Sequence, residues 1–145
     1  MNELIDRITD KDDKAAYEYT KRLIASSADS PEYYGYLSLF ASFLSHKSSF
    51  VRTRAFALCC AQARWDEEGR LDEILPDMLK LLHDEKPTVV RQCLKAAAEV
   101  IRYRPHLAGR IGQEAAAIDL TRYRDSMAPL IQRDVAELLK TIRED

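Results

Sequence analysis

Turn-forming residues are scarce in this chain: its 145 residues include only four glycines and five prolines. An all-β fold needs many turns, which these two residues commonly supply, so their scarcity favours helices. Disordered proteins lack apolar side chains, whereas this chain is 46% hydrophobic and 32% charged. A chain of this length is typical of one domain, and we expect a single all-α domain over residues 1–145.

An excess of positive charge is also absent, since 22 basic residues face 24 acidic ones and the formal net charge is −2. Salt-driven binding to nucleic acid needs clustered cations, so nucleic acid is not the expected partner. The longest uncharged run, residues 33–46, is too short to span a membrane. Residues 1–6 carry acids where a signal peptide has a basic stretch. We therefore expect a cytoplasmic protein with no membrane contact.

Catalytic and metal-binding patterns are missing as well. The three cysteines, Cys59, Cys60 and Cys93, lack ligand spacing, and adjacent helical residues point about 100° apart, so we expect buried thiols and no metal. The three histidines lie in separate segments, and no phosphate loop or nucleophile motif occurs. These absences predict a protein that is not an enzyme and needs no cofactor.

Helix boundaries follow from capping residues, prolines and apolar spacing. We expect Thr9-Asp10 to cap the second helix, Ser30 to precede a helix that begins at Pro31, and Ser126 to cap the last helix. The first expected helix is short, at residues 4–8. The later ones cover about 11–27, 31–46, 50–65, 74–82, 87–104, 105–118 and 127–142.

These expected helices repeat in register. Val90-Arg91 follows Val51-Arg52 by 39 residues, and Pro129 follows Pro87 by 42 residues, which aligns Val89 with Ile131. One arginine therefore recurs early in the second helix of three pairs, as Arg52, Arg91 and Arg133. Such periodicity is typical of stacked helical repeats, in which each pair needs its neighbours to cover its apolar face.

Helix pairs of about 40 residues with a Val-Arg dipeptide resemble HEAT repeats. The resemblance implies a right-handed α-solenoid, or α-α superhelix, of about four antiparallel helix pairs. These are a capping pair at 1–28 and repeat pairs at 31–65, 70–104 and 105–143. HEAT repeats often pair the arginine with an acid in the turn, which implies that Asp84 accompanies Arg91. We interpret Arg52, Asp84, Arg91 and Arg133 as structural; the alternative is a surface for acidic partners.

Residues 65–91 also resemble small bacterial HEAT-like proteins of undefined role, some of which carry a SufBD label that denotes iron–sulfur assembly. This resemblance implies an accessory role beside iron–sulfur cluster assembly. Such a role predicts that Cys60 or Cys93 is accessible to thiol reagents.

The register also shows one local conflict. Phe56 aligns with Lys95 and Glu137 of the later repeats, and Cys60 aligns with Glu99 and Thr141. If this face is exposed, it is an apolar patch that could bind a partner. The alternative is that the N-terminal helices cover it, and the sequence leaves both open.

Three further residues complete the candidate partner surface: Trp65, Arg104 and Tyr123. Trp65 could stack on a ligand, although packing at a helix end is the more common role. Arg104 and Tyr123 belong to two segments that mix arginine with tyrosine, a combination that can bind single-stranded nucleic acid. The preferred interpretation is that Tyr123 anchors the last loop between helices.

The sequence therefore predicts a non-enzymatic module that binds another protein through a helical-repeat surface. The alternative is a nucleic-acid-binding protein related to HEAT-like DNA glycosylases, which resemble this chain in architecture. The partner and the oligomeric state stay open.

Overall fold

The computed structural model describes residues 2–144, with the side chains of residues 3–143, and these residues form helices and turns without a strand. The predicted all-α class is thus confirmed. The α-helices are α1 (Asn2–Ile8), α2 (Asp13–Ser27), α3 (Leu37–Ser42), α4 (Ser49–Ala61), α5 (Arg70–Lys80), α6 (Pro87–Tyr103), α7 (Ala108–Ala116) and α8 (Ala128–Glu144). One-turn 3₁₀ helices lie at Tyr34–Tyr36, Ala63–Trp65, Leu81–His83, Pro105–Leu107 and Leu120–Arg122.

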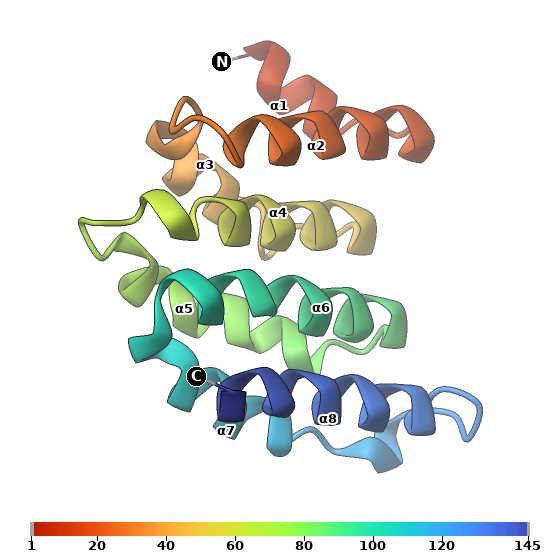
Figure 1. Ribbon diagram of the computed structural model, residues 1–145. Helices are drawn as coiled ribbons and strands as arrows, with labels where there is room; N and C mark the ends of the chain where they lie inside the picture. The colour runs from red at the N-terminus through yellow and green to blue at the C-terminus, as the bar shows by residue number, and fades with distance from the viewer. Residues whose placement is uncertain (1, 145) are drawn as a thin grey trace.

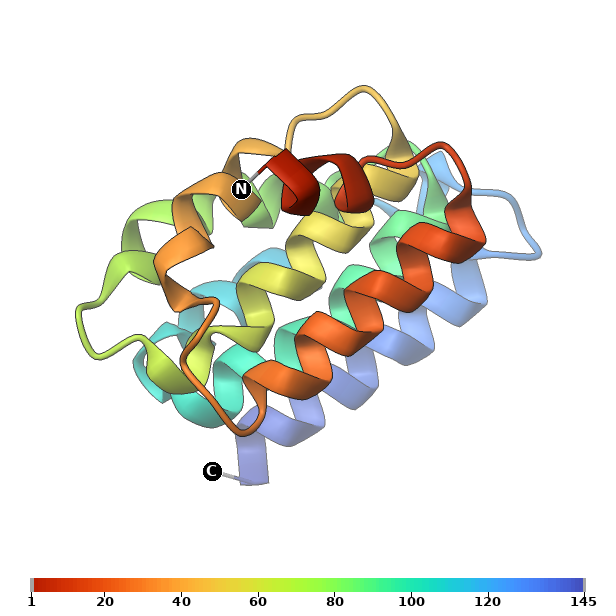
Figure 2. The same ribbon diagram turned by 90° about the horizontal axis from the view of Figure 1, so that it is seen from above.

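The even-numbered helices lie side by side in chain order, so that α4 packs against α2 and α6, and α6 packs against α8 (Figure 1). The shorter odd-numbered helices form a second layer behind them, which is clear from above (Figure 2). One apolar cluster runs through both layers from Leu4 and Ile8 to Leu138. Among the described residues, no helix combines the length and the apolar character that crossing a bilayer requires.

Helix starts follow local chemistry, though not always at the expected residue. The Asp12 carboxylate, rather than Asp10, caps α2 by accepting a bond from the backbone N–H of Ala15, and Ser48 caps α4 in the same way. Pro87 occupies the first turn of α6, as expected. Ser126 is exposed, and α8 begins two residues later at Ala128.

The expected helix over residues 31–46 is much shorter in the structure. Its first part is a 3₁₀ turn at Tyr34–Tyr36, and the α-helix covers only Leu37–Ser42. Gly35 and the three neighbouring tyrosines are weak helix formers. In addition, the Tyr34 hydroxyl donates a 2.5 Å hydrogen bond to the Asp66 carboxylate, which fixes this segment by a tertiary contact.

Candidate functional site

Two of the recurring arginines join successive even-numbered helices. The Arg52 guanidinium donates two bonds to the Asp84 carboxylate, at 2.9 and 3.1 Å, and further bonds to the carbonyls of His46 and Lys47. The Arg91 guanidinium pairs with Asp134 on α8, at 2.6 and 3.4 Å. The hydrogen bond from Arg91 to Asp134 raises the pKa of Arg91. These side chains therefore have structural roles.

The prediction that Asp84 pairs with Arg91 is wrong. Asp84 precedes α6, and its carboxylate binds Arg52 of α4 instead. The reason is geometric: Arg52 on α4 reaches forward to the residue that precedes α6, just as Arg91 on α6 reaches forward to Asp134 on α8. Arg133 is exposed, and it forms no hydrogen bond or ion pair with the side chains of residues 3–143.

The expected apolar patch at Phe56 and Cys60 is not exposed. Both side chains are only 2% exposed and belong to the core, so the alternative in which the N-terminal helices cover this face is correct. Cys59 and Cys93 are also buried, and burial raises the pKa of all three thiols, that of Cys59 to about 12. None of the three is placed to react or to bind an external cluster.

Trp65 and Arg104 satisfy backbone carbonyls at the ends of neighbouring helices. The Trp65 indole N–H donates a 2.7 Å bond to the carbonyl of Ser27, and Arg104 Nε donates a 2.8 Å bond to the carbonyl of Ala63. The last carbonyls of a helix lack partners within the helix, so these bonds complete them. Both residues act in packing at this end of the stack.

Tyr123 anchors the last loop, as expected. It is 7% exposed, its hydroxyl donates a 2.7 Å bond to the carbonyl of Asp84, and burial raises its pKa. The five residues predicted as a partner surface therefore do not form one surface. Phe56 and Cys60 lie in the core, Trp65 and Arg104 bind backbone carbonyls at one end of the helices, and Tyr123 binds the carbonyl of Asp84 elsewhere.

The acidic segment Asp66-Glu67-Glu68 precedes α5. Glu67 and Glu68 are exposed, whereas Asp66 is only 1% exposed. Its carboxylate accepts bonds from the backbone N–H groups of Arg70 and Leu71 at the start of α5. Asp66 is thus a structural cap.

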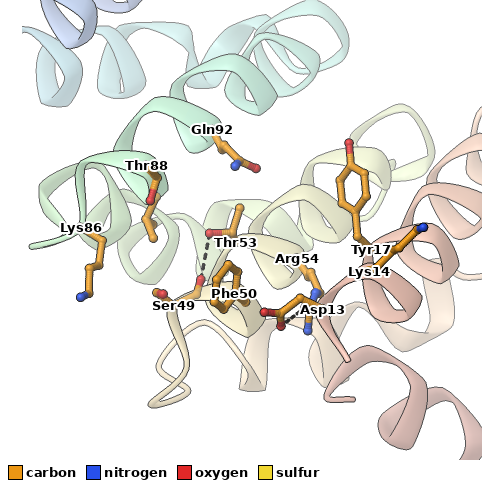
Figure 3. A pocket seen from close by; sticks show the side chains of 11 residues that line it. Asp13, Lys14, Tyr17, Ser49, Phe50, Thr53, Arg54, Lys86, Thr88 and Gln92 are labelled. Atoms are coloured by element: carbon orange, nitrogen blue, oxygen red, sulfur yellow. Dashed lines mark hydrogen bonds and ion pairs between the residues drawn. The ribbon is translucent and has the colours of Figure 1, made fainter. Parts of the chain in front are cut away.

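The structure instead presents a groove of about 670 Å³ across the N-terminal parts of α2, α4 and α6. Figure 3 shows side chains from all three helices around it. We call this the N-terminal groove. Its lining is Asp13, Lys14 and Tyr17 from α2, Ser49, Phe50, Thr53 and Arg54 from α4, and Lys86, Thr88, Val89 and Gln92 at the start of α6.

Two large apolar side chains stand out in this groove. Tyr17 is 53% exposed and Phe50 is 57% exposed, and they are the exposed large hydrophobic residues of the described chain. The offset of 39 residues that aligns Val51 with Val90 also aligns Phe50 with Val89, which in turn aligns with Ile131. Val89 is 2% exposed and Ile131 is fully buried. Phe50 thus occupies a core position of the repeat that no neighbour covers.

Some charged side chains around the groove form an ion pair, and others do not. Arg54 is 6% exposed; it donates a 2.9 Å bond to the carbonyl of Ile8 and a 2.9 Å bond to the Asp13 carboxylate. Lys14 and Lys86 are exposed and form no ion pair with any residue that the structure describes. The N-terminal groove therefore carries an apolar surface flanked by two free cations.

The titratable side chains of the groove are few. No histidine or cysteine lines it, and its carboxylate is already engaged by Arg54. Elsewhere, His83 lies 2.7 Å from Glu114 and His106 lies 3.1 Å from Asp72, so two of the histidines connect the α5 region to the α7 region. Within residues 2–144, no cluster of three potential metal ligands occurs.

No protein-family model matches this chain, and no curated protein or solved structure shows significant similarity to it.

Proposed function

We propose that this protein is a non-enzymatic module that binds another protein, and that its scaffold is a short right-handed α-solenoid of HEAT-like repeats. Support for the scaffold comes from the side-by-side order of α2, α4, α6 and α8 and from the arginines that join successive repeats at Asp84 and Asp134. The pairs at residues 31–65, 70–104 and 105–143 are the repeats in this proposal, and residues 1–28 are the capping pair.

One observation supports the binding role most strongly: the large hydrophobic side chains exposed among the described residues, Tyr17 and Phe50, line the same groove. Single exposed apolar residues are ordinary on protein surfaces, but their concentration in a hollow is typical of a binding site. Exposed aromatic residues also contribute disproportionately to protein interfaces. We therefore assign the partner surface to the N-terminal groove rather than to the face of Phe56 and Cys60.

The residues that line the groove include no nucleophile paired with a general base, which supports a binding role rather than catalysis. Three free buried cysteines are compatible with the cytoplasm, where thiols stay reduced, and we propose this location. A role beside iron–sulfur assembly required an accessible Cys60 or Cys93, and their exposures of 2% and 1% argue against it.

The proposal can be tested by quantitative affinity capture from a nuclease-treated lysate. We expect at least one protein to be retained by the wild type and reduced roughly 10-fold with Tyr17→Ala/Phe50→Ala, because both anchors lose their contact area. The matched control is Gln132→Ala/Arg133→Ala on the exposed face of α8, which should retain the same protein.

Recovery of nucleic acid alone from an untreated lysate would favour the nucleic-acid-binding alternative. In that case a filter-binding titration should show affinity that falls steeply with added salt. Equal capture by the wild type and the groove variant would remove the N-terminal groove from the proposal.

A further inference from the structure

We infer that the N-terminal groove binds a short, extended, acidic segment of the partner protein, with an apolar side chain that inserts between Tyr17 and Phe50. The inference rests on the proposed protein-binding function and specifies the chemistry of the bound segment. Its basis is the arrangement of charge around the exposed aromatic residues.

The free cations flank the apolar centre. Lys14 is on α2 and Lys86 immediately precedes α6, while Phe50 is on α4, which lies between those two helices (Figure 1). The close-up places Phe50 between the two lysines (Figure 3). Because Arg54 and Asp13 neutralise each other, the charge that faces a ligand in this groove is positive. Complementary charge therefore calls for acids on both sides of the inserted apolar residue.

The orientation of the helices adds to the same preference. α2, α4 and α6 all present their first turns to the groove, through Asp13, Ser49 and Thr88. The N-terminal end of a helix carries a partial positive charge, which favours anions nearby. Asp12 and Asp13 already offset this charge at α2, but the first turns of α4 and α6 contain no acid, so these two ends supplement the two lysines.

The geometry also limits the length of the segment. The groove crosses three neighbouring helices, and packed helices lie about 8–10 Å apart, so its two sides are separated by roughly 20 Å. An extended chain advances about 3.3 Å per residue, and about six residues therefore span the groove. We expect an acid near each end of such a segment and an aromatic or aliphatic residue near its centre.

Other occupants fit less well. Nucleic acid would need a denser set of cations than Lys14 and Lys86 provide on a chain of net charge −2. A second copy of this chain could offer the exposed acids Glu67 and Glu68, but the adjacent Trp65 is already fixed to Ser27. The acidic loop of a second copy thus lacks a free apolar anchor.

The test is selection of a displayed library of random 12-residue peptides on the full-length protein, followed by anisotropy titrations of the enriched peptides. We expect the enriched peptides to carry Asp or Glu on both sides of an apolar residue. Lys14→Glu/Lys86→Glu should weaken their binding roughly 10-fold or more, because two attractive pairs become repulsive. Lys80→Glu/Lys140→Glu makes the same change in net charge on α5 and α8, and it should leave the affinity unchanged.

A second arm of the test repeats the selection on Lys14→Glu/Lys86→Glu, which should now enrich peptides with basic flanks. Circular dichroism verifies that each variant is folded. Peptides could instead lose affinity with Phe50→Ala, show no preference for acidic residues and bind Lys14→Glu/Lys86→Glu as tightly as the wild type. That result would overturn the inference of an acidic segment and leave the proposal of a protein-binding groove intact. If no peptide binding depends on Phe50, both proposals are overturned. Self-association of the wild type that Phe50→Ala abolishes would identify a second copy as the occupant and overturn the inference.

Discussion

The junction between α2 and α4 differs in kind from the junction between α4 and α6. At three aligned positions, α6 faces its predecessor with Val89, Cys93 and Ile101, all of which are buried and apolar. α4 carries Phe50, Arg54 and Gln62 at the corresponding places, one residue exposed and two polar. At these positions the later junction is therefore apolar throughout, whereas the earlier one adds two polar contacts and an exposed ring to the apolar packing of Phe56 and Cys60.

Those polar contacts lie near both ends of α4. Arg54 binds the carbonyl of Ile8 and the Asp13 carboxylate, while Gln62 donates a 3.0 Å bond to the Ser27 hydroxyl. Buried polar bonds contribute less net stability than apolar packing of the same volume, because water satisfies the same groups in the unfolded chain. We conclude that the α2–α4 junction is the weaker one, and that its open end leaves Tyr17 and Phe50 available to a partner.

The largest effect should come from removing the pair that joins the α4 repeat to the α6 repeat. The side chains of Arg52 and Asp84 are 14% and 7% exposed. Asp84→Ala leaves the guanidinium with only the carbonyls of His46 and Lys47, at a place where water can hardly replace the buried carboxylate. We expect the free energy of unfolding in urea to fall by about 3 kcal/mol.

The matched variant at the α2–α4 junction is Asp13→Ala. Its carboxylate is 49% exposed, and Arg54 keeps its bond to the carbonyl of Ile8, so we expect a loss of at most about 1 kcal/mol. Equal losses for the two variants would show that the two junctions do not differ as described.

An effect between those of Asp84→Ala and Asp13→Ala is expected at the C-terminal end of α4. Ser27→Ala removes the bond partner of Gln62, whose amide oxygen already has no partner among the described residues, and should cost about 1–2 kcal/mol. Ser27→Ala/Gln62→Ile should recover that loss, because Gln62 is fully buried at the position where α6 has Ile101. Urea unfolding measures both variants. A double variant no more stable than Ser27→Ala would indicate that the polar contact is required for packing.

The rate of cysteine labelling should show that the α2–α4 junction opens more readily than the α4–α6 junction. Cys60 lines a small hollow with Ile24 and Ala28 of the α2 region, whereas Cys93 lies on α6 in the later part of the stack. In the native state both thiols are buried and their pKa values are raised by burial, so labelling requires opening. With low urea, we expect Cys60 to react about 10-fold faster than Cys93 in variants that keep one cysteine each. Faster labelling of Cys93 would place the weak junction elsewhere.

Much of this fold was predictable from local sequence, and the exceptions have identifiable causes. Pro87 and the apolar spacing predict the long helices, because these features act within one or two turns. The offset of the sequence repeat predicts how the helices align. The predicted helix over residues 31–46 is too long, because the contact between Tyr34 and Asp66 joins residues 32 positions apart and local sequence does not reveal it.

The position of the candidate site could not be predicted from the aligned sequence segments. Alignment identifies equivalent residues such as Arg52 and Arg91, but it does not say whether each binds its own turn or the next repeat. It also aligns Phe50 with Val89 and Ile131, which predicts burial. Exposure of Phe50 follows only from where α2 lies, which the sequence of α4 does not encode.

The smallest expected effect on stability provides the most direct test, namely the urea unfolding free energy of Phe50→Ala measured beside Ile131→Ala. Ile131→Ala should cost about 3 kcal/mol, since it empties a fully buried site. Phe50→Ala should cost less than about 0.5 kcal/mol, because the ring is 57% exposed in an open groove. A loss at Phe50 as large as that at Ile131 would show that the groove is closed in solution, and would contradict the account.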